Sequence, residues 1–336
     1  MDKILTISIA AYNIEKYIRH TLEAFLIPDI MNEIEVIIVN DGSSDNTLYW
    51  AQYYERLYPG VFKVINKKNG GYGSTINIAV KNAHGKYFKT IDGDDWVDSN
   101  GIIYLVNYLK KCNDDMVVSN FSRINDKTGK VIPTYYNSPV YEEGKSFDDL
   151  YSDQEIYMQA ITFKTEILKE MNLDITEHCF YTDIEYILKP IVYVRTISFL
   201  EVNVYMYRIA VNEQSMSVAG KRKHIDEQLK IYKKMIAYFV DNYNILTESK
   251  RDYFIIILAA MLKSHIAAIL SLKINRKSYG RLIEIEKFTK GIAPEVYKKA
   301  NQYKVIKILR IFNYQIYYFG AILYKIYQYW LRIRGN

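Results

Sequence analysis

The chain has 336 residues, of which 49% are hydrophobic and 24% are charged, and its formal net charge is +6. This length suits about two domains, and the composition is that of a folded globular protein. The two cysteines, Cys112 and Cys179, exclude a disulfide framework and show no metal-site spacing, so we expect a reducing, cytoplasmic setting.

The first third of the chain alternates strand-like and helix-like segments. Apolar, β-rich runs predict strands at residues 4–10, 33–41, 61–66, 86–92 and 115–120, and helical spacing fills the gaps between them. The first run is too short for a signal-peptide core and lacks a cleavage site, so we take it as a strand. The alternation predicts an α/β fold with a mostly parallel sheet, whose binding sites lie at the carboxyl ends of the strands.

The pattern changes in the second half of the chain. A polar, Tyr-rich connector after residue 121 leads to a second βα region that continues to about residue 209. From residue 221 onward Gly and Pro become scarce and apolar residues recur every three or four positions, which predicts a helical C-terminal region. We therefore predict two domains, residues 1–217 and residues 218–336.

Two acidic turns follow predicted strands. The first, "VNDGSSDNT", contains Asp41, and the second, "TIDGDDWVD", contains Asp92, Asp94 and Asp95. Crowded carboxylates at a strand end lose hydration and repel one another, so such a cluster indicates a positive partner. The Asp-x-Asp spacing suits Mg²⁺ or Mn²⁺, which completes its shell with phosphate oxygens and would hold a diphosphate. The alternative for an isolated acidic turn is a solvated turn with a helix cap.

Several motifs in order carry a family resemblance. The stretches "ISIAAYNIEKYIRHTLEAF", "EVIIVNDGSSDNT" and "NKKNGGYGSTINIAVKNAHGKYFKTIDGDD" resemble the successive motifs of family-two glycosyltransferases, which are inverting enzymes of the GT-A fold. The resemblance covers roughly residues 4–120 and continues more weakly to about residue 217. It implies sugar transfer from a nucleotide diphosphate sugar, with inversion at the anomeric carbon and with Mn²⁺ or Mg²⁺ as cofactor.

The same resemblance implies a nucleotide site. Ala11 and Tyr12 lie where relatives contact the base, Asp41 where they accept its hydrogen bonds, and Asp92 where they face the ribose. Uridine is the expected base.

The metal and the nucleotide loop are implied in the same way. Asp94 corresponds to the metal carboxylate, with Asp95 as a second candidate, and Gly71 and Gly73 permit close backbone approach to the nucleotide. Many relatives read Ala-Arg-Asn where this chain reads Thr-Ile-Asn at residues 75–77, so the charge of this part of the pocket is open.

Inversion requires a base on the acceptor hydroxyl. The stretch "FYTDIEY" resembles the helix-initiating Glu-Asp pair of relatives, which makes Asp183 the candidate base and Glu177 and Glu185 its rivals. Asp183 could instead cap a helix. Further on, "YMYRIAVNEQSMS" resembles a segment from which Arg208 or Gln214 would close over the diphosphate or contact the acceptor.

The predicted function is thus a metal-dependent, inverting transferase of the hexosyl or N-acetylhexosaminyl class. Its expected acceptor is a glycan, a lipid-linked glycan or a protein in bacterial surface polysaccharide or glycoconjugate synthesis. A nucleotidyltransferase is one alternative, although "AAYNIEKY" supplies no basic Gly-rich loop. A catalytically silent nucleotide-sugar-binding module is the other, although Asp41, Asp92 and Asp94 are all present.

The tail from about residue 303 carries six basic residues and no acidic one, which accounts for the entire net charge. On one helical projection the polar and basic side chains share a broad face: Lys304, Lys307, Arg310, Lys325, Gln328 and Arg332. We expect peripheral contact with an anionic membrane at the inner face of the cell membrane, and the alternative is an amphipathic helix packed on the catalytic domain. A homo-oligomer is a further possible partner, and no nucleic-acid module is recognisable.

Overall fold

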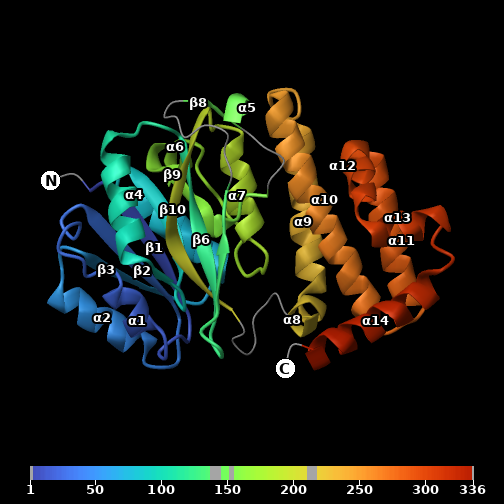
Figure 1. Cartoon of the computed structure of the whole chain (residues 1–336), viewed down its shortest axis with the longest axis horizontal. Helices are drawn as coiled ribbons and strands as arrows, with labels where there is room; N and C mark the ends of the chain where they lie inside the picture. The colour runs from blue at the N-terminus through green and yellow to red at the C-terminus, as the bar shows by residue number, and fades with distance from the viewer. Residues whose placement is uncertain (1–2, 137–144, 151–154, 210–217, 335–336) are drawn as a thin grey trace. The chain divides into compact units, whose positions relative to one another are not determined.

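The computed structural model describes residues 3–136, 145–150, 155–209 and 218–334. The chain forms two compact units, Met1–Asn212 and Glu213–Asn336, which are described separately (Figure 1). The predicted domain boundary after residue 217 falls at the end of a stretch outside the described residues.

A mixed ten-stranded sheet forms the centre of the first unit. Its strands are β1 Leu5–Ala11, β2 Ile34–Asp41, β3 Phe62–Lys67, β4 Tyr87–Asp92, β5 Trp96–Val97, β6 Met116–Asn125, β7 Val131–Thr134, β8 Lys145–Ser146, β9 Ile161–Lys164 and β10 Thr196–Ile209. They follow the order β3-β2-β1-β4-β9-β6-β10-β5, with β7 paired to β6 and β8 paired to β10.

The strand directions explain where a site can form. β3, β2, β1 and β4 are parallel, as are β6 and β10, and β9 joins the two groups by antiparallel pairing. The arrangement confirms the α/β class. The sheet is mixed because β9 pairs antiparallel with both β4 and β6. Ala11 pairs with Asn40 and Ala10 pairs with Asp92, so the ends of β1, β2 and β4 meet at one edge. Both acidic turns begin there.

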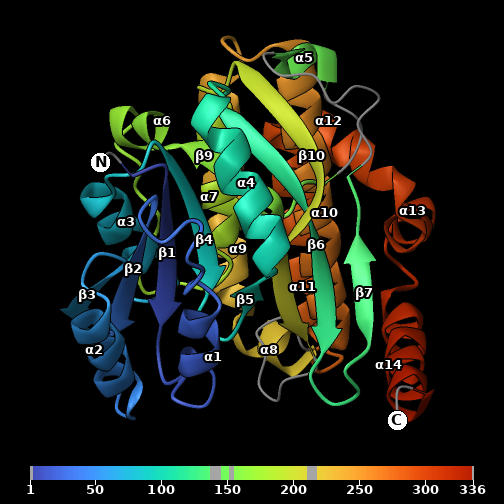
Figure 2. The ribbon, with the colours of Figure 1, turned by 60° about the vertical axis from the view of Figure 1, so that its left-hand side comes forward.

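Helices cover both faces of this sheet, which is why β1 and β2 are buried along nearly their whole length. Figure 2 shows α1, α2 and α4 in front of the sheet and α7 behind it. The helices of this unit are α1 Ile18–Glu23, α2 Thr47–Leu57, α3 Tyr72–Asn82, α4 Ser99–Lys111, α5 Phe147–Leu150, the 3₁₀ turn Met158–Ala160, α6 Thr165–Glu170 and α7 Asp183–Ile191.

Aromatic packing fixes α7 on the sheet. Phe88 of β4 and Phe163 of β9 are register partners. The ring of Tyr186 lies 6.5 Å from that of Phe88 and 5.4 Å from that of Phe163, measured between centroids. Tyr186 is fully buried, and Asp183 is the first residue of the same helix, about one turn earlier. This packing therefore holds Asp183 against the sheet.

The second unit is helical in its described part, which confirms the predicted C-terminal helical region. Its helices are α8 Val218–Lys223, α9 Ile225–Asn242, α10 Glu248–Ser271, α11 Arg276–Ile292, α12 Pro294–Lys299, the 3₁₀ turn Ala300–Gln302, α13 Lys304–Ile311 and α14 Tyr317–Arg334. α10 contacts α9, α11, α12 and α14 and is the central helix of the unit.

By length and composition α10 is apolar enough to cross a membrane, and among the described residues it is the one helix of which this holds. Its most apolar window has a mean hydropathy of 2.1, and 78% of that window is buried within the structure. The helix has 24 residues. The core helix of a globular unit has the same properties.

The tail departs from the single helix on which its projection was based. Asn313 and Tyr314 adopt positive φ angles of 45° and 62°, which end α13 and separate it from α14. Arg310 was predicted on the basic face, but its Nε lies 2.6 Å from Glu286 Oε2 and its side chain is only 8% exposed. The predicted continuous basic face is therefore wrong at this residue.

Candidate active site

Asp41 ends β2 and is enclosed by the loop that follows β3. Its Oδ1 accepts hydrogen bonds from Gly70 N at 2.8 Å and Lys67 Nζ at 2.6 Å, and its Oδ2 accepts one from Gly71 N at 2.8 Å. Gly42 has a φ of 73°, and a Cβ on it would lie 2.9 Å from Asn69 N, so only glycine suits this close turn. The three donors fix the carboxylate at the strand end.

The turn after β1 is tied to the turn after β2. Asn13 N donates to Ser43 Oγ at 3.1 Å, Ser44 N donates to Asn13 Oδ1 at 2.8 Å, and Ile14 N donates to Thr47 Oγ1 at 2.8 Å. Side chains that bond to backbone groups in this way order loops that no strand ladder holds. The two predicted nucleotide turns are thus one connected structure.

Two residues predicted to face the base lie in that structure. Ala11 is fully buried at the end of β1, and the next side chain, Tyr12, is 53% exposed. Since Ala11 pairs with Asn40, Tyr12 stands beside Asp41. An exposed aromatic ring at this position is open to a stacking partner.

Glycines at the start of α3 allow another part of the chain to approach. Gly71 has a φ of 80°, and a Cβ on it would lie 3.2 Å from His178 N. A Cβ on Gly73 would lie 2.3 Å from the carbonyl oxygen of Thr176. We predicted that these glycines admit the nucleotide. The neighbour that the structure shows is the segment at residues 175–179, which precedes Asp183 in sequence, and the contact of the glycines with a nucleotide stays a prediction.

The three aspartates of the acidic turn after β4 differ in their burial and in their hydrogen bonds. Asp95 is fully buried, and its Oδ2 accepts a hydrogen bond from Tyr205 Oη at 2.6 Å while its Oδ1 accepts one from Arg208 N at 2.6 Å. Asp92 and Asp94 are half-buried. Asp95 thereby links the turn to β10, and Asp94 is the better candidate for holding a cation.

Arg208 packs behind this turn. Its guanidinium lies 4.8 Å from the ring centroid of Tyr17 and 4.7 Å from that of Trp96, and it forms an ion pair with Asp126. Its Nε also donates to the carbonyl oxygen of Asp94 at 2.8 Å. These contacts anchor the side chain beside Asp94, and its contact with a diphosphate stays a prediction. Gln214 lies outside the described residues.

The carboxyl group of Asp92 interacts with that of Asp94 in the same turn and with that of Asp183, which is distant in sequence. Burial, followed by the negative charges of Asp94 and Asp183, raises the pKa of Asp92 to about 7. Burial also raises the pKa values of Asp94 and Asp183. The tertiary fold thus brings Asp183 to the acidic turn, as its assignment as base requires, and its catalytic role itself stays a prediction.

The rival bases have other surroundings. Glu185 is fully buried, its Oε1 lies 3.0 Å from Lys189 Nζ, and its Oε2 accepts a hydrogen bond from Thr176 N at 2.8 Å. Those contacts make it a structural residue of α7. Glu177 is exposed and accepts a hydrogen bond from Asn77 Nδ2 at 3.4 Å.

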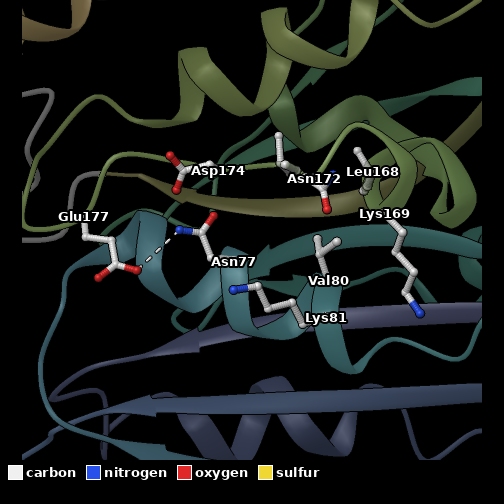
Figure 3. Close-up of a pocket in the computed structure, with 9 residues that line it drawn as sticks. Asn77, Val80, Lys81, Leu168, Lys169, Asn172, Asp174 and Glu177 are labelled. Atoms are coloured by element: carbon white, nitrogen blue, oxygen red, sulfur yellow. Dashed lines mark hydrogen bonds between the residues drawn. The ribbon is translucent and has the colours of Figure 1, made fainter.

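Glu177 lines a cavity of about 400 Å³ between α3 and the segment that follows α6 (Figure 3). In Figure 3 the Glu177 carboxylate meets the Asn77 amide at one end of the cavity, the side chain of Lys81 extends toward Asn77, and Lys169 lies toward the other end. The acidic-turn residues do not line this cavity. It is therefore distinct from the site at the strand ends.

A cation is compatible with the acidic turn. The described residues contain no group of three or more His, Cys, Asp or Glu side chains arranged to enclose a metal. Asp94 nevertheless offers carboxylate oxygens as ligands. The pKa values of Asp92 and Asp94 are both raised, mainly by burial. A hard divalent cation there would take its remaining ligands from water or from phosphates of a bound ligand.

Two residues that contact the aspartates of the site were not predicted from the sequence. Lys67 pairs with Asp41, and Tyr205 holds Asp95. Tyr205 belongs to the "YMYR" stretch from which Arg208 was selected, so its motif was visible. Lys67 had one available signal, its position at the end of a strand beside the strand that ends in Asp41.

A mixed α/β sheet with two acidic turns at the ends of its strands is the arrangement that we expect of a glycosyltransferase of the GT-A fold. Residues 6–171 match the family model described as Glycosyl transferase family 2. The chain belongs to this family, as its motifs predicted.

Similar proteins agree with this assignment. The chain is 29% identical over 265 residues to EpsH of Bacillus subtilis (strain 168), a protein described as a glycosyltransferase, covering 74% of this chain and 72% of the relative. It is 22% identical over 274 residues to glycosyltransferase GlyA of Streptococcus pneumoniae, covering 72% of this chain and 38% of GlyA. The crystal structure of S. aureus TarS 1–349 in complex with UDP-GlcNAc has a TM-score of 0.67 at 18% identity, covering 96% of this chain and 91% of TarS, which shows a shared fold.

Proposed function

We propose that this chain is a metal-dependent, inverting glycosyltransferase that moves a sugar from a UDP-sugar to a hydroxyl group of a glycan, of a lipid-linked glycan or of a protein. The observation that carries the proposal is that the fold brings Asp183 near enough to Asp92 for its negative charge to raise the pKa of Asp92, although about 90 residues separate them in sequence. An inverting transferase needs a base beside the site that holds the donor diphosphate.

The donor assignment is supported by the two tied turns. Asp41 Oδ2 accepts one hydrogen bond among the described contacts, so it keeps acceptor capacity for a base N–H group. Tyr12 offers its ring beside it, and Asp92 follows on β4 for the ribose. Uridine is favoured because TarS, which shares the fold, was solved with UDP-GlcNAc.

The chemistry would be a single displacement. The acceptor oxygen attacks the anomeric carbon while the bond from that carbon to the diphosphate breaks, and Asp183 takes the proton that the acceptor hydroxyl loses. Burial raises the pKa of Asp183, which makes it a stronger base than an exposed carboxylate. A divalent cation such as Mg²⁺ or Mn²⁺ at Asp94 would offset the charge growing on the leaving diphosphate.

The proposed acceptor is a hydroxyl group of a bacterial glycan, lipid-linked glycan or protein. We propose a role in bacterial surface polysaccharide or glycoconjugate synthesis, which agrees with the bacterial glycosyltransferases among the relatives. The chemistry proposed for the donor side is the same for each of these acceptors.

The test compares Asp183→Asn with the exposed control Asp29→Asn in a sugar-transfer assay. We expect Asp183→Asn to lower turnover by roughly 10²–10⁴-fold, since it removes the base, and to leave UDP-sugar affinity within a few fold. Asp29→Asn should behave as wild type, because Asp29 is exposed and is not part of the site.

Two results would refute the assignment. Retained turnover in Asp183→Asn would show that Asp183 is not the base. Loss of donor binding in that variant would show that Asp183 has a structural role instead. Product analysis separates the reaction classes, because a nucleotidyltransferase would attach a nucleoside monophosphate to its substrate instead of a sugar.

A further inference from the structure

Helix α14 presents an apolar surface to solvent. Six side chains along it are between 43% and 62% exposed: Tyr318, Phe319, Ile322, Leu323, Ile326 and Tyr327. At 3.6 residues per turn they cover about half of the helix circumference. We refer to these six as the outer face of α14. An outward-facing surface of this composition is unusual for a helix on a globular unit, whose solvent side is normally polar.

The opposite side of α14 already packs against the unit. Tyr317 and Ala321 are fully buried, and α14 contacts α10. The ring of Tyr279 in α11 lies 5.6 Å from that of Tyr317, measured between centroids. One side of α14 therefore packs against the unit. The outer face is a second apolar surface, which the described part of the unit leaves exposed.

Helix α13, the preceding helix, also exposes apolar side chains, and it adds positive charge. Ile308, Ile311 and the following Phe312 are 48%, 67% and 54% exposed. Lys304 and Lys307 are also exposed, and the spacing 304, 307, 308 and 311 puts these lysines on the same side as Ile308 and Ile311. Leu309 and Ile306 are buried on the other side of the helix.

The charge of this surface has one sign. No Asp or Glu occurs between residues 303 and 336. Arg310, the one basic side chain of α13 that turns inward, is paired with Glu286 and leaves the two lysines on the outer side. A partner that covers this surface must offer an apolar layer together with negative charge.

We propose that the outer face of α14 and the exposed side of α13 dock on the surface of an anionic lipid bilayer. Apolar side chains would enter the boundary between headgroups and acyl chains, and Lys304 and Lys307 would meet anionic headgroups. Pairing with a second copy would bury the same apolar residues but would bring like charges together across a two-fold interface. The contact is peripheral, because α10, the helix long enough to span a bilayer, is mostly buried.

The test is co-sedimentation of the full chain with two kinds of vesicle, one of phosphatidylcholine alone and one with a third of phosphatidylglycerol. We expect binding to the anionic vesicles, weakened by raising the salt concentration, and at least tenfold weaker binding to the neutral ones. Lys304→Gln with Lys307→Gln should weaken binding about 25-fold, since each lysine near an anionic surface contributes about fivefold.

Apolar variants test the other half of the surface. Ile322→Glu with Ile326→Glu should weaken binding by at least about tenfold, because two apolar contacts are replaced by charges that anionic lipid repels. The matched controls are Ile245→Glu, whose side chain is 69% exposed outside this surface, and Lys230→Gln, an exposed lysine of α9. Both controls should bind vesicles as the wild type does.

Each contrary result overturns the proposal. Wild-type protein that stays in the supernatant with anionic vesicles, or that binds both vesicle types equally, contradicts it. Light scattering that shows a wild-type dimer, with outer-face variants monomeric and vesicle binding unchanged, would assign the surface to a second copy. Thermal stabilisation by UDP should be the same in all variants, so a failure of the proposed transferase function would be seen separately.

Discussion

The Nζ of Lys67 lies 2.6 Å from the Oδ1 of Asp41, where β3 and β2 end as register partners. The side chain of Asp41 is 4% exposed and that of Lys67 is 21% exposed. Lys67 also donates to Ser74 Oγ at 2.8 Å and to the carbonyl oxygen of Lys68 at 2.8 Å. One lysine therefore joins the strand end, the glycine loop and the first turn of α3.

Replacing this lysine should damage both stability and nucleotide binding. Lys67→Met leaves a buried carboxylate without its cation, so we expect the free energy of unfolding to fall by about 2 kcal/mol. UDP affinity should fall as well, because the loop at Gly70 and Gly71 loses an anchor. Chemical unfolding and calorimetric UDP titration measure the two effects, with the exposed neighbour Lys68→Met as control. Equal behaviour of the two variants would contradict the role given to Lys67.

Gly73 allows a close packing contact that its replacement should disrupt. In Gly73→Ala the new Cβ would lie 2.3 Å from the oxygen of Thr176 and 2.7 Å from Cγ2 of Ile175. We expect a loss of roughly 1–3 kcal/mol in the free energy of unfolding, with slower transfer because the displaced segment leads to Asp183. The measurement is urea unfolding together with turnover.

A second glycine supplies the control for this substitution. Gly280 lies within helix α11, and a Cβ there would have no neighbour within 4 Å. Gly280→Ala should raise stability by up to about 1 kcal/mol, since alanine favours the helix. A Gly73→Ala variant as stable as Gly280→Ala would show that the contact is not tight.

The two neighbouring aspartates of the acidic turn should differ in their variants. Asp95 accepts hydrogen bonds on both oxygens, and asparagine would turn an NH₂ group toward one of the donors, Tyr205 or Arg208 N. Asp95→Asn should therefore lower the free energy of unfolding by about 1 kcal/mol or more. Asp94→Asn should keep the fold and lose metal-dependent nucleotide binding. Thermal unfolding with and without UDP and Mn²⁺ separates the two, and a reversed pattern would exchange their roles.

His265 should make the helical unit sensitive to acid. Its Nδ1 lies 3.1 Å from Gln228 Oε1, and burial, with Arg281 adding to the effect, lowers the pKa of His265 to about 4. As the pH falls below about 6.5 the unfolded chain takes up a proton that the folded chain refuses until about pH 4. The free energy of unfolding should thus fall across this window, by up to about 3 kcal/mol.

The measurement for His265 is urea unfolding at several pH values between 7.5 and 4.5. In His265→Gln the decline below pH 6.5 should be smaller, because the titrating group is gone while a hydrogen-bonding side chain remains. An identical decline in wild type and variant would assign the acid sensitivity to other groups.

The sequence predicted those parts of the fold whose signal is local. Buried parallel strands appear as apolar runs, which is why β1, β2 and β4 lie where residues 4–10, 33–41 and 86–92 were expected. The two acidic turns lie at the same edge of the sheet because the parallel register brings the ends of these strands together. Local patterns were thus sufficient for the strands and for the edge of the sheet at which the site lies.

The departures from prediction depend on contacts between distant residues. Arg310 turns inward because Glu286, in another helix, offers its carboxylate, and no periodicity within the tail records this. The break between α13 and α14 is set by the positive φ angles of Asn313 and Tyr314, whereas apolar spacing alone favours one helix. The pairing of Asp95 with Tyr205 likewise joins residues 110 positions apart.

The most direct test of the proposed transferase is calorimetric titration of UDP into the purified full chain, with and without Mn²⁺, in wild type and in Asp94→Asn. We predict that Mn²⁺ strengthens UDP binding to the wild type by at least tenfold and has no effect on Asp94→Asn, because Asp94 is the carboxylate assigned to the cation. UDP binding that is equally strong with and without Mn²⁺, or no UDP binding at all, would contradict the account.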